Sequence, residues 1–182
     1  QKLYPSDISK ISSAYKWKNG QRALIYFNLF DEKVPGYEYN GEVVYISNVL
    51  TKDIIPLTEE TADSIGDDRI TITGGWIGSY YLNLYFEFRG TSNPKELHMV
   101  NLVRNETDGA VEDNEYLVLE FRHNAHDDYD RETLKGIVSF RLNLTEEEFE
   151  KYKGIKVRTN TINEGVQYDK FDFTGQETKV SG

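Results

Sequence analysis

The sequence predicts an all-β protein, and three observations carry this prediction. The 182 residues include 13 Tyr, 9 Phe and 2 Trp but only one Met, and aromatic and β-branched side chains favour pleated sheets. Apolar and polar residues alternate over 81–89 and 116–124, which is the pattern of half-buried strands. Residues typical of turns separate the strand-like runs.

The first 57 residues are predicted to form a small N-terminal barrel. A strand over 22–30 follows the Asn19-Gly20 turn, and a second strand spans 42–50. The segment 34–41 between them is rich in turn residues and aromatics, so we expect a mobile hairpin tip there.

The segment 58–65 is predicted to be a linker between two domains. Pro56 precedes it, acidic residues stand at its start, and Gly66 follows it as a possible end of a short helix. The regular alternation of strands becomes clearer after this point. We therefore predict a second domain over 66–175 and a disordered tail over 176–182.

The second domain is predicted to be an antiparallel β-sandwich of about seven strands. The strands 81–89, 96–104 and 116–124 are expected to form a meander, in which each strand pairs antiparallel with the next. Thr145 and Glu148 have the spacing of a capping box, which predicts a short helix over 146–153 closed by Gly154. The expected strands are 81–89, 96–104, 116–124 and 136–142, followed by a terminal hairpin of 155–162 and 166–173.

Composition excludes several classes of function. The formal net charge of −10 opposes binding to nucleic acid or to an anionic membrane surface. The sequence has no Cys, which removes disulfides, thiolate nucleophiles and thiolate metal sites. No apolar run is long enough to span a bilayer. Gln1 in place of Met predicts that a start codon, and with it a targeting segment, has been removed.

No sequence motif points to a reaction. The chain contains no phosphate-binding loop, nucleophile elbow or zinc spacing. We therefore expect no cofactor and no catalytic residue.

The end of the 116–124 strand is the most informative candidate site, because it carries two of the three His residues into a polar corner. Arg122 shares a strand face with Glu120, which favours a structural ion pair, while the functional reading is that Arg122 and Asn124 line a pocket beside His123. The third His, His98, is expected to be a partly buried residue with satisfied hydrogen bonds.

A divalent metal is a weaker alternative at the same corner, since imidazole and carboxylate groups suit zinc or manganese. The acids of such a loop more often bond to their own backbone. The possible ligands are His123, His126, Asp127 and Asp128.

Aromatic residues supply the remaining binding candidates. Trp76 lies among three glycines, and its ring is expected to fill the sandwich core, with stacking on a sugar as the alternative reading. Tyr37 and Tyr39, in the predicted hairpin tip, are expected to be exposed and to contact a ligand or partner.

Several segments resemble the NigD-like family of Bacteroidetes cell-envelope lipoproteins. These segments occur in the order that is typical of the family. The run Phe121-Arg122-His123-Asn124 is the most specific element of the resemblance. The matching segments are 54–58, 76–78, 81–84, 98–103, 119–125 and 136–140.

The resemblance implies an OB-like N-terminal barrel, a C-terminal β-sandwich, and export with anchoring through a lipidated Cys upstream of this chain. It brings no catalytic residue with it. We therefore predict a non-enzymatic envelope protein, periplasmic or on the cell surface, that binds an unknown protein or glycan. The alternatives are a metal-assisted hydrolase of glycans and a bacteriocin immunity protein whose acidic surface binds a cationic toxin.

Overall fold

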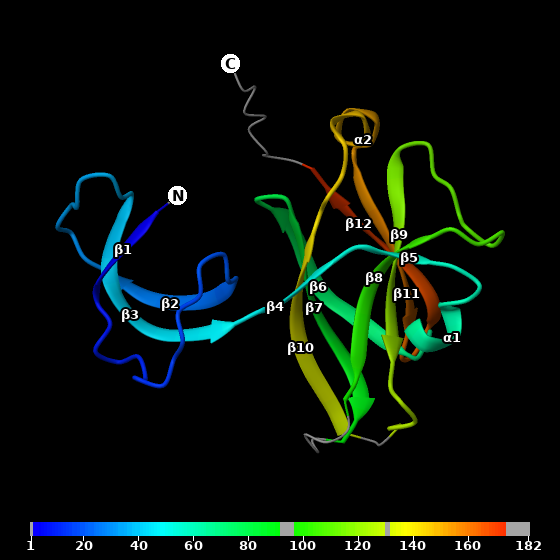
Figure 1. Cartoon of the computed structure of the whole chain (residues 1–182), viewed down its shortest axis with the longest axis horizontal. Helices are drawn as coiled ribbons and strands as arrows, with labels where there is room; N and C mark the ends of the chain where they lie inside the picture. The colour runs from blue at the N-terminus through cyan, green and yellow to red at the C-terminus, as the bar shows by residue number, and fades with distance from the viewer. Residues whose placement is uncertain (1, 92–96, 130–131, 174–182) are drawn as a thin grey trace. The chain divides into compact units, whose positions relative to one another are not determined.

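The computed structural model describes residues 2–91, 97–129 and 132–173, and the chain divides into two compact units, Gln1–Leu50 and Thr51–Gly182 (Figure 1). Strands dominate both units, which confirms the predicted all-β class. Among the residues that the structure describes, neither helix is long and apolar enough to cross a membrane.

The N-terminal unit is a three-stranded sheet in the order β1-β3-β2. The strands are β1 (Leu3–Asp7), β2 (Ala23–Leu29) and β3 (Tyr39–Asn48). Strand β1 runs parallel to β3, and β2 runs antiparallel to it with a bulge at Tyr26 and Phe27. Val43 and Val49 are buried, whereas five of the seven residues of β2 are exposed.

The C-terminal unit is a β-sandwich of two sheets, with the strand orders β4-β10-β7-β6 and β12-β11-β9-β8-β5 (Figure 1). Apolar side chains from both sheets form one core, where Phe121 packs edge-on against Phe86 and Phe140. The strands are β4 (Leu50–Asp53), β5 (Ile55–Leu57), β6 (Ile70–Gly78), β7 (Tyr81–Gly90), β8 (Met99–Asn105), β9 (Tyr116–Asn124), β10 (Glu132–Arg141), β11 (Gly154–Thr161) and β12 (Gly165–Asp172).

The domain boundary lies earlier than the sequence predicts. Strands β4 and β5 pair with β10 and β8, so the stretch 51–57, which we assigned to the barrel, belongs to the sandwich. Pro56 is compatible with β5 because β5 is an edge strand, where a residue without an N–H is tolerated. The predicted linker 58–65 includes helix α1 (Ala62–Ile65), and Ile65 packs against Leu57 and Val103.

Strand pairing in the sandwich matches the predicted meander only in part. The predicted antiparallel pairing of β8 with β9 is confirmed. The predicted pairing of β7 with β8 is wrong, because β7 lies in the other sheet and pairs with β6 and β10. Strands β9 and β11 are parallel neighbours. Alternation along one strand indicates its buried face but carries no information on its partner, so it does not predict the pairings of β7 and β11.

Two local predictions are confirmed. The terminal hairpin pairs β11 with β12. Helix α2 (Glu146–Lys151) begins with the predicted capping box, in which Thr145 Oγ1 accepts from the Glu148 N–H and Glu148 Oε2 accepts from the Thr145 N–H. The helix ends earlier than predicted because Gly154 already belongs to β11. The predicted disordered tail lies outside the described residues.

Candidate functional site

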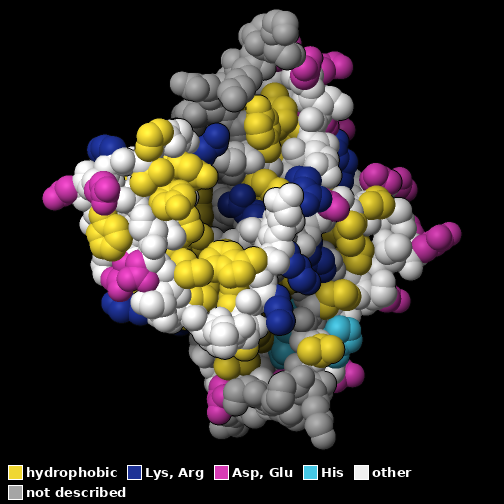
Figure 2. All heavy atoms as spheres, turned by 60° about the vertical axis from the view of Figure 1, so that its left-hand side comes forward, with side chains coloured by type: hydrophobic (Ala, Val, Ile, Leu, Met, Phe, Trp, Pro, Cys, Tyr) yellow, Lys and Arg dark blue, Asp and Glu magenta, His cyan; other side chains and the backbone are white. Residues whose placement is uncertain are grey.

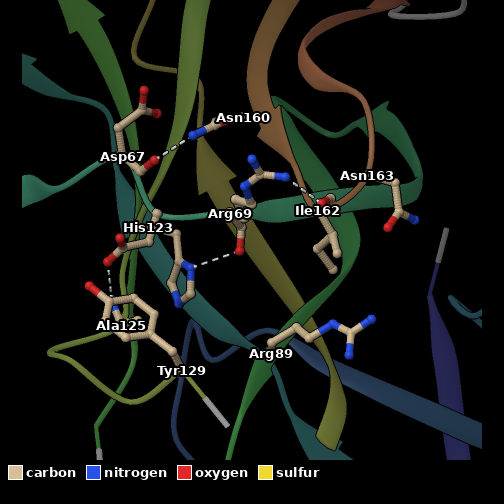
Figure 3. Close-up of a pocket in the computed structure, with 10 residues that line it drawn as sticks. Asp67, Arg69, Arg89, His123, Ala125, Tyr129, Asn160, Ile162 and Asn163 are labelled. Atoms are coloured by element: carbon tan, nitrogen blue, oxygen red, sulfur yellow. Dashed lines mark hydrogen bonds between the residues drawn. The ribbon is translucent and has the colours of Figure 1, made fainter. Parts of the chain in front are cut away.

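A pocket of about 520 Å³, lined mostly by polar residues, opens at one end of the sandwich (Figure 3). Its volume lies in the range of about 300–1,000 Å³ that is usual for small-molecule sites. The lining residues come from the start of β6 and the ends of β7, β9 and β11, which are distant in sequence. They are Asp67, Asp68, Arg69, Arg89, His123, Ala125, Tyr129, Asn160, Ile162 and Asn163.

His123 is the buried imidazole of this pocket, with 1% of its surface exposed. Its Nδ1 lies 3.2 Å from the carbonyl oxygen of Arg69, and its Nε2 lies 2.8 Å from Nδ1 of His98. Burial, followed by repulsion from His98, lowers the pKa of His123 to about 4. The neutral ring therefore donates from Nδ1 to the carbonyl and accepts at Nε2 from His98.

His98 links the imidazole of His123 to Asp128. The Nε2 atom of His98 lies 3.1 Å from Asp128 Oδ2, and both side chains are 8% exposed. The same carboxylate oxygen accepts hydrogen bonds from the backbone N–H and the hydroxyl of Thr91, at 2.7 and 2.8 Å. This arrangement confirms the prediction that His98 is a partly buried residue with satisfied hydrogen bonds.

The loop after β9 adopts a strained conformation that presents Asp128 to His98. His126 and Asp127 have φ of 48° and 66°, a left-handed region that residues other than Gly seldom occupy. The backbone N–H of His126 donates to Asn124 Oδ1 at 2.8 Å, and the N–H of Asp128 donates to the Ala125 carbonyl at 3.0 Å. These bonds close the turn locally.

An ion-pair network lies next to the pocket. Asp67 accepts two hydrogen bonds of 2.8 Å from Arg158, and its Oδ1 lies 3.2 Å from Arg122. Arg122 also pairs with Glu120, which is buried and accepts from Asn105 at 2.8 Å. Two carboxylates and two guanidinium groups thus balance each other in charge. The predicted ion pair of Arg122 with Glu120 is confirmed.

Groups of opposite charge stand on the two sides of His123. Tyr129 and Ala125 lie on one side of the ring in Figure 3, and Arg69 and Arg89 lie on the other. Asp68 belongs to the Tyr129 side, because its Oδ2 accepts from the Ala125 N–H at 2.8 Å. The negative charges of Asp68 and Asp127, with some burial, raise the pKa of the Tyr129 hydroxyl.

The structure brings only part of the predicted corner into the pocket. His123 lines it, whereas Arg122 contacts it through Asp67, and Asn124 donates to the Ser64 carbonyl at 3.0 Å. The four possible metal ligands do not form one cluster: His126 Nδ1 lies 2.6 Å from the Leu97 carbonyl oxygen, whereas Asp128 Oδ2 lies 3.1 Å from His98 Nε2. Within the described residues, no group of three or more His, Asp or Glu could hold a metal ion.

The predictions for the aromatic candidates are partly wrong. Trp76 is 42% exposed and packs against Tyr85, so the expectation that it fills the core is wrong. Strand β6 has a bulge between Ile72 and Gly74, and such an extra residue changes which side chains of a strand face the core. Tyr37 is 41% exposed as expected, but Tyr39 belongs to β3 and is partly buried against Phe27.

Sequence reasoning missed most of the lining residues. The run Asp67-Asp68-Arg69 stands at the start of the predicted second domain and was given no role, and Asn160 to Asn163 were assigned only to the terminal hairpin and its turn. A signal was present in both places, because polar residues cluster where a strand begins or ends. Their meeting depends on the parallel pairing of β9 with β11.

Comparisons with known proteins agree with this architecture. Residues 53–173 match the model of the NigD-like C-terminal beta sandwich domain, and residues 1–49 match that of the NigD-like N-terminal OB domain. A search of curated proteins finds no match.

Several crystal structures share the fold. A protein of unknown function (DUF1344) from Bacteroides vulgatus ATCC 8482 has 28% identity and a TM-score of 0.81, covering 99% of this chain and 82% of that chain. A candidate toxin-related protein from Parabacteroides distasonis ATCC 8503 has 31% identity and a TM-score of 0.75, covering 97% and 83%. A candidate lipoprotein from Bacteroides fragilis NCTC 9343 has 11% identity and a TM-score of 0.62, covering 96% and 89%.

Proposed function

The chain belongs to the NigD-like family in both of its domains, and from this premise we propose that it is a non-enzymatic envelope protein that binds a glycan in the sandwich pocket. The hydrogen bonding of the pocket is the observation that carries this proposal. Its central imidazole, His123, uses both ring nitrogens in contacts with Arg69 and His98. Asp67 is held by Arg158 and Arg122.

These contacts favour recognition over catalysis. A general base needs a basic atom within reach of the substrate proton, but the basic atom of neutral His123 faces His98. A rigid set of side chains with satisfied hydrogen bonds is instead suited to holding a ligand in one orientation. The proposal therefore gives the pocket a binding role in which the ligand leaves unchanged.

The location outside the cytoplasm is part of the proposal. It is supported by the lipoproteins of the family and by the candidate lipoprotein from Bacteroides fragilis that shares the fold. In the full-length protein, a lipid attached upstream of this chain would anchor it to the membrane, facing the periplasm or the cell exterior.

A second candidate function, binding of a partner protein, is supported by the N-terminal unit. Of the 19 large apolar residues that are exposed in the described chain, 11 belong to residues 1–50. Figure 2 shows apolar side chains gathered on the face that it presents. The first 50 residues have six Lys and Arg against five Asp and Glu, so this surface is less acidic than the rest of the chain.

A glycan array separates the two candidates from each other and from catalysis. The wild-type chain should retain a defined set of glycans, and Asp68→Asn with Asn160→Ala should retain none, because both side chains line the pocket. Eluted glycans should have unchanged mass. Tyr168→Ala, an exposed aromatic outside the pocket, is the matched control.

Partner binding is tested by a pull-down from detergent-solubilised envelope. Tyr26 and Tyr45 are 61% and 52% exposed, and their rings lie 5.7 Å apart on paired strands. A protein retained by the wild type and lost in Tyr26→Ala with Tyr45→Ala would assign the contact to this surface. If the double variant retains the same protein, the contact does not lie on the surface around Tyr26 and Tyr45.

A further inference from the structure

We propose that the glycan bound in the pocket is an acidic sugar, whose carboxylate contacts Arg69 and Arg89 and whose hydroxyl groups contact Asp68, Tyr129 and Asn160. This inference rests on the proposed binding function and adds the chemical class of the ligand. It comes from the separation of charge across His123: Arg69 and Arg89 lie on one side of the ring in Figure 3, and Asp68 lies on the other, where it accepts from the Ala125 N–H.

The basic side of the pocket is suited to a carboxylate. Arg69 Nη1 donates to the carbonyl oxygen of Ile162 at 2.7 Å. This neutral acceptor positions the guanidinium group but does not neutralise its charge, and Arg69 remains exposed. Arg89 lines the same side. Guanidinium groups bind carboxylates in a planar, bidentate geometry.

The described acids of the pocket leave the positive charge of Arg69 in place. Asp67 belongs to the ion-pair network, where Arg158 and Arg122 match its negative charge. Asp68 faces the opposite side, where it accepts from the Ala125 N–H. His123, between the two sides, is neutral because burial lowers its pKa. A ligand with one anionic end is therefore favoured on the Arg69 side.

The opposite side offers groups that bind hydroxyls. A carboxylate has about four acceptor positions, and the Ala125 N–H and the Tyr129 hydroxyl occupy two of those of Asp68. The Asn160 amide donates from Nδ2 to the Asp67 carbonyl at 2.7 Å, which fixes its orientation and leaves its carbonyl oxygen as an acceptor. Tyr129 is 63% exposed and adds both a hydroxyl and an aromatic face.

Other anions fit less well. A simple carboxylate or phosphate would use only the basic side and would leave Asp68 and Asn160 without a role. A polyanion would meet the strong negative charge of residues 51–182, which contain 15 Lys and Arg against 26 Asp and Glu. A single carboxylate on a polyhydroxylated ring matches both sides of the pocket.

The test is isothermal titration calorimetry of the whole chain with three probes: D-galacturonate, D-galactose and acetate. We expect galacturonate to bind at least tenfold more tightly than galactose or acetate, since neither control reaches both sides. Arg69→Gln should weaken galacturonate binding about tenfold and leave any galactose binding unchanged. Arg141→Gln, which removes an exposed cation paired with Asp53, should bind galacturonate like the wild type.

Each other outcome overturns the inference. Galactose binding as tight as galacturonate binding would show that the pocket does not select charge, although the proposed glycan-binding function would stand. If acetate binds as tightly as galacturonate, the pocket recognises the carboxylate alone and is a simple anion site. If no probe binds, the acidic-sugar inference fails, and the glycan array decides the proposed function separately. Circular dichroism and thermal unfolding of Arg69→Gln separate lost binding from lost folding.

Discussion

Nδ1 of His98 and Nε2 of His123 lie 2.8 Å apart, and their rings are stacked with an angle of 15° between their planes. His98 directly precedes β8 and His123 belongs to β9, and these two strands pair with Met99 opposite Asn124. The contact between the two rings connects the pocket to the loop that carries Asp128. The pocket and its supporting loop therefore share one chain of hydrogen bonds.

Stability should depend on pH through His123. Its folded-state pKa of about 4 lies below the unfolded value of about 6.5, so the unfolded chain binds more protons between these values. The free energy of unfolding should fall as the pH falls from about 6.5 to 4, by up to about 3 kcal/mol, and should not depend on this group above that window. Urea unfolding at pH 7.5 and 4.5 measures the loss.

The variant His123→Gln isolates this contribution. The two chains differ only at this position, so the difference between their pH dependences reports His123 and its contact with His98. The wild type should lose more stability on acidification than the variant. An equal loss in both chains would contradict the assignment of a low pKa to His123.

His123 should be neutral, with its single proton on Nδ1. Nδ1 faces the carbonyl oxygen of Arg69, which can only accept, and burial lowers the pKa of the ring to about 4. Long-range ¹H–¹⁵N spectra at pH 7 should show a protonated Nδ1 and an unprotonated Nε2 in His123. Protons on both nitrogens of His123 would contradict this arrangement.

The ion-pair network should be sensitive to the loss of one member. Glu120→Ala leaves Arg122 and Asn105 without the carboxylate that they share, and breaking a buried pair by removing one partner costs about 3–5 kcal/mol. Chemical unfolding should show a loss of this size. The exposed pair of Arg141 and Asp53 is the control, since solvent screens such a pair and Asp53→Ala should cost far less than Glu120→Ala.

Close packing at Gly136 gives a further test of the sandwich core. A Cβ built on this residue would lie within 2.9 Å of two ring atoms of Phe86, and overpacking of this kind costs about 1–3 kcal/mol. Gly136→Ala should therefore lower the unfolding midpoint. Gly109→Ala, where the nearest atom is Thr107 Oγ1 at 3.6 Å, should have little effect.

Features that depend on local sequence were predictable. The capping box at Thr145 and the ion pair of Arg122 with Glu120 involve residues two or three positions apart, and the alternation in β7 and β9 identified the buried faces. Family resemblance supplied the two-domain architecture, which the family matches confirm.

Features that depend on strand order were not predictable from pattern. The contact between Asp67 and Arg158 spans 91 residues, and it forms only because α1 and β11 both pass close to β9. Trp76 is exposed because a bulge lies earlier in its strand. The neighbouring glycines indicated that a bulge was possible but did not determine its position. Long-range pairing thus determined both the pocket and its charge.

The glycan array with the wild-type chain and the Asp68→Asn, Asn160→Ala variant tests the central claim most directly, because it measures recognition in the pocket without assuming a ligand. The predicted result is a set of retained glycans that is lost in the pocket variant and kept in Tyr168→Ala, with eluted glycans of unchanged mass. Equal retention by the pocket variant, no retention by the wild type, or release of cleaved glycans would contradict the account.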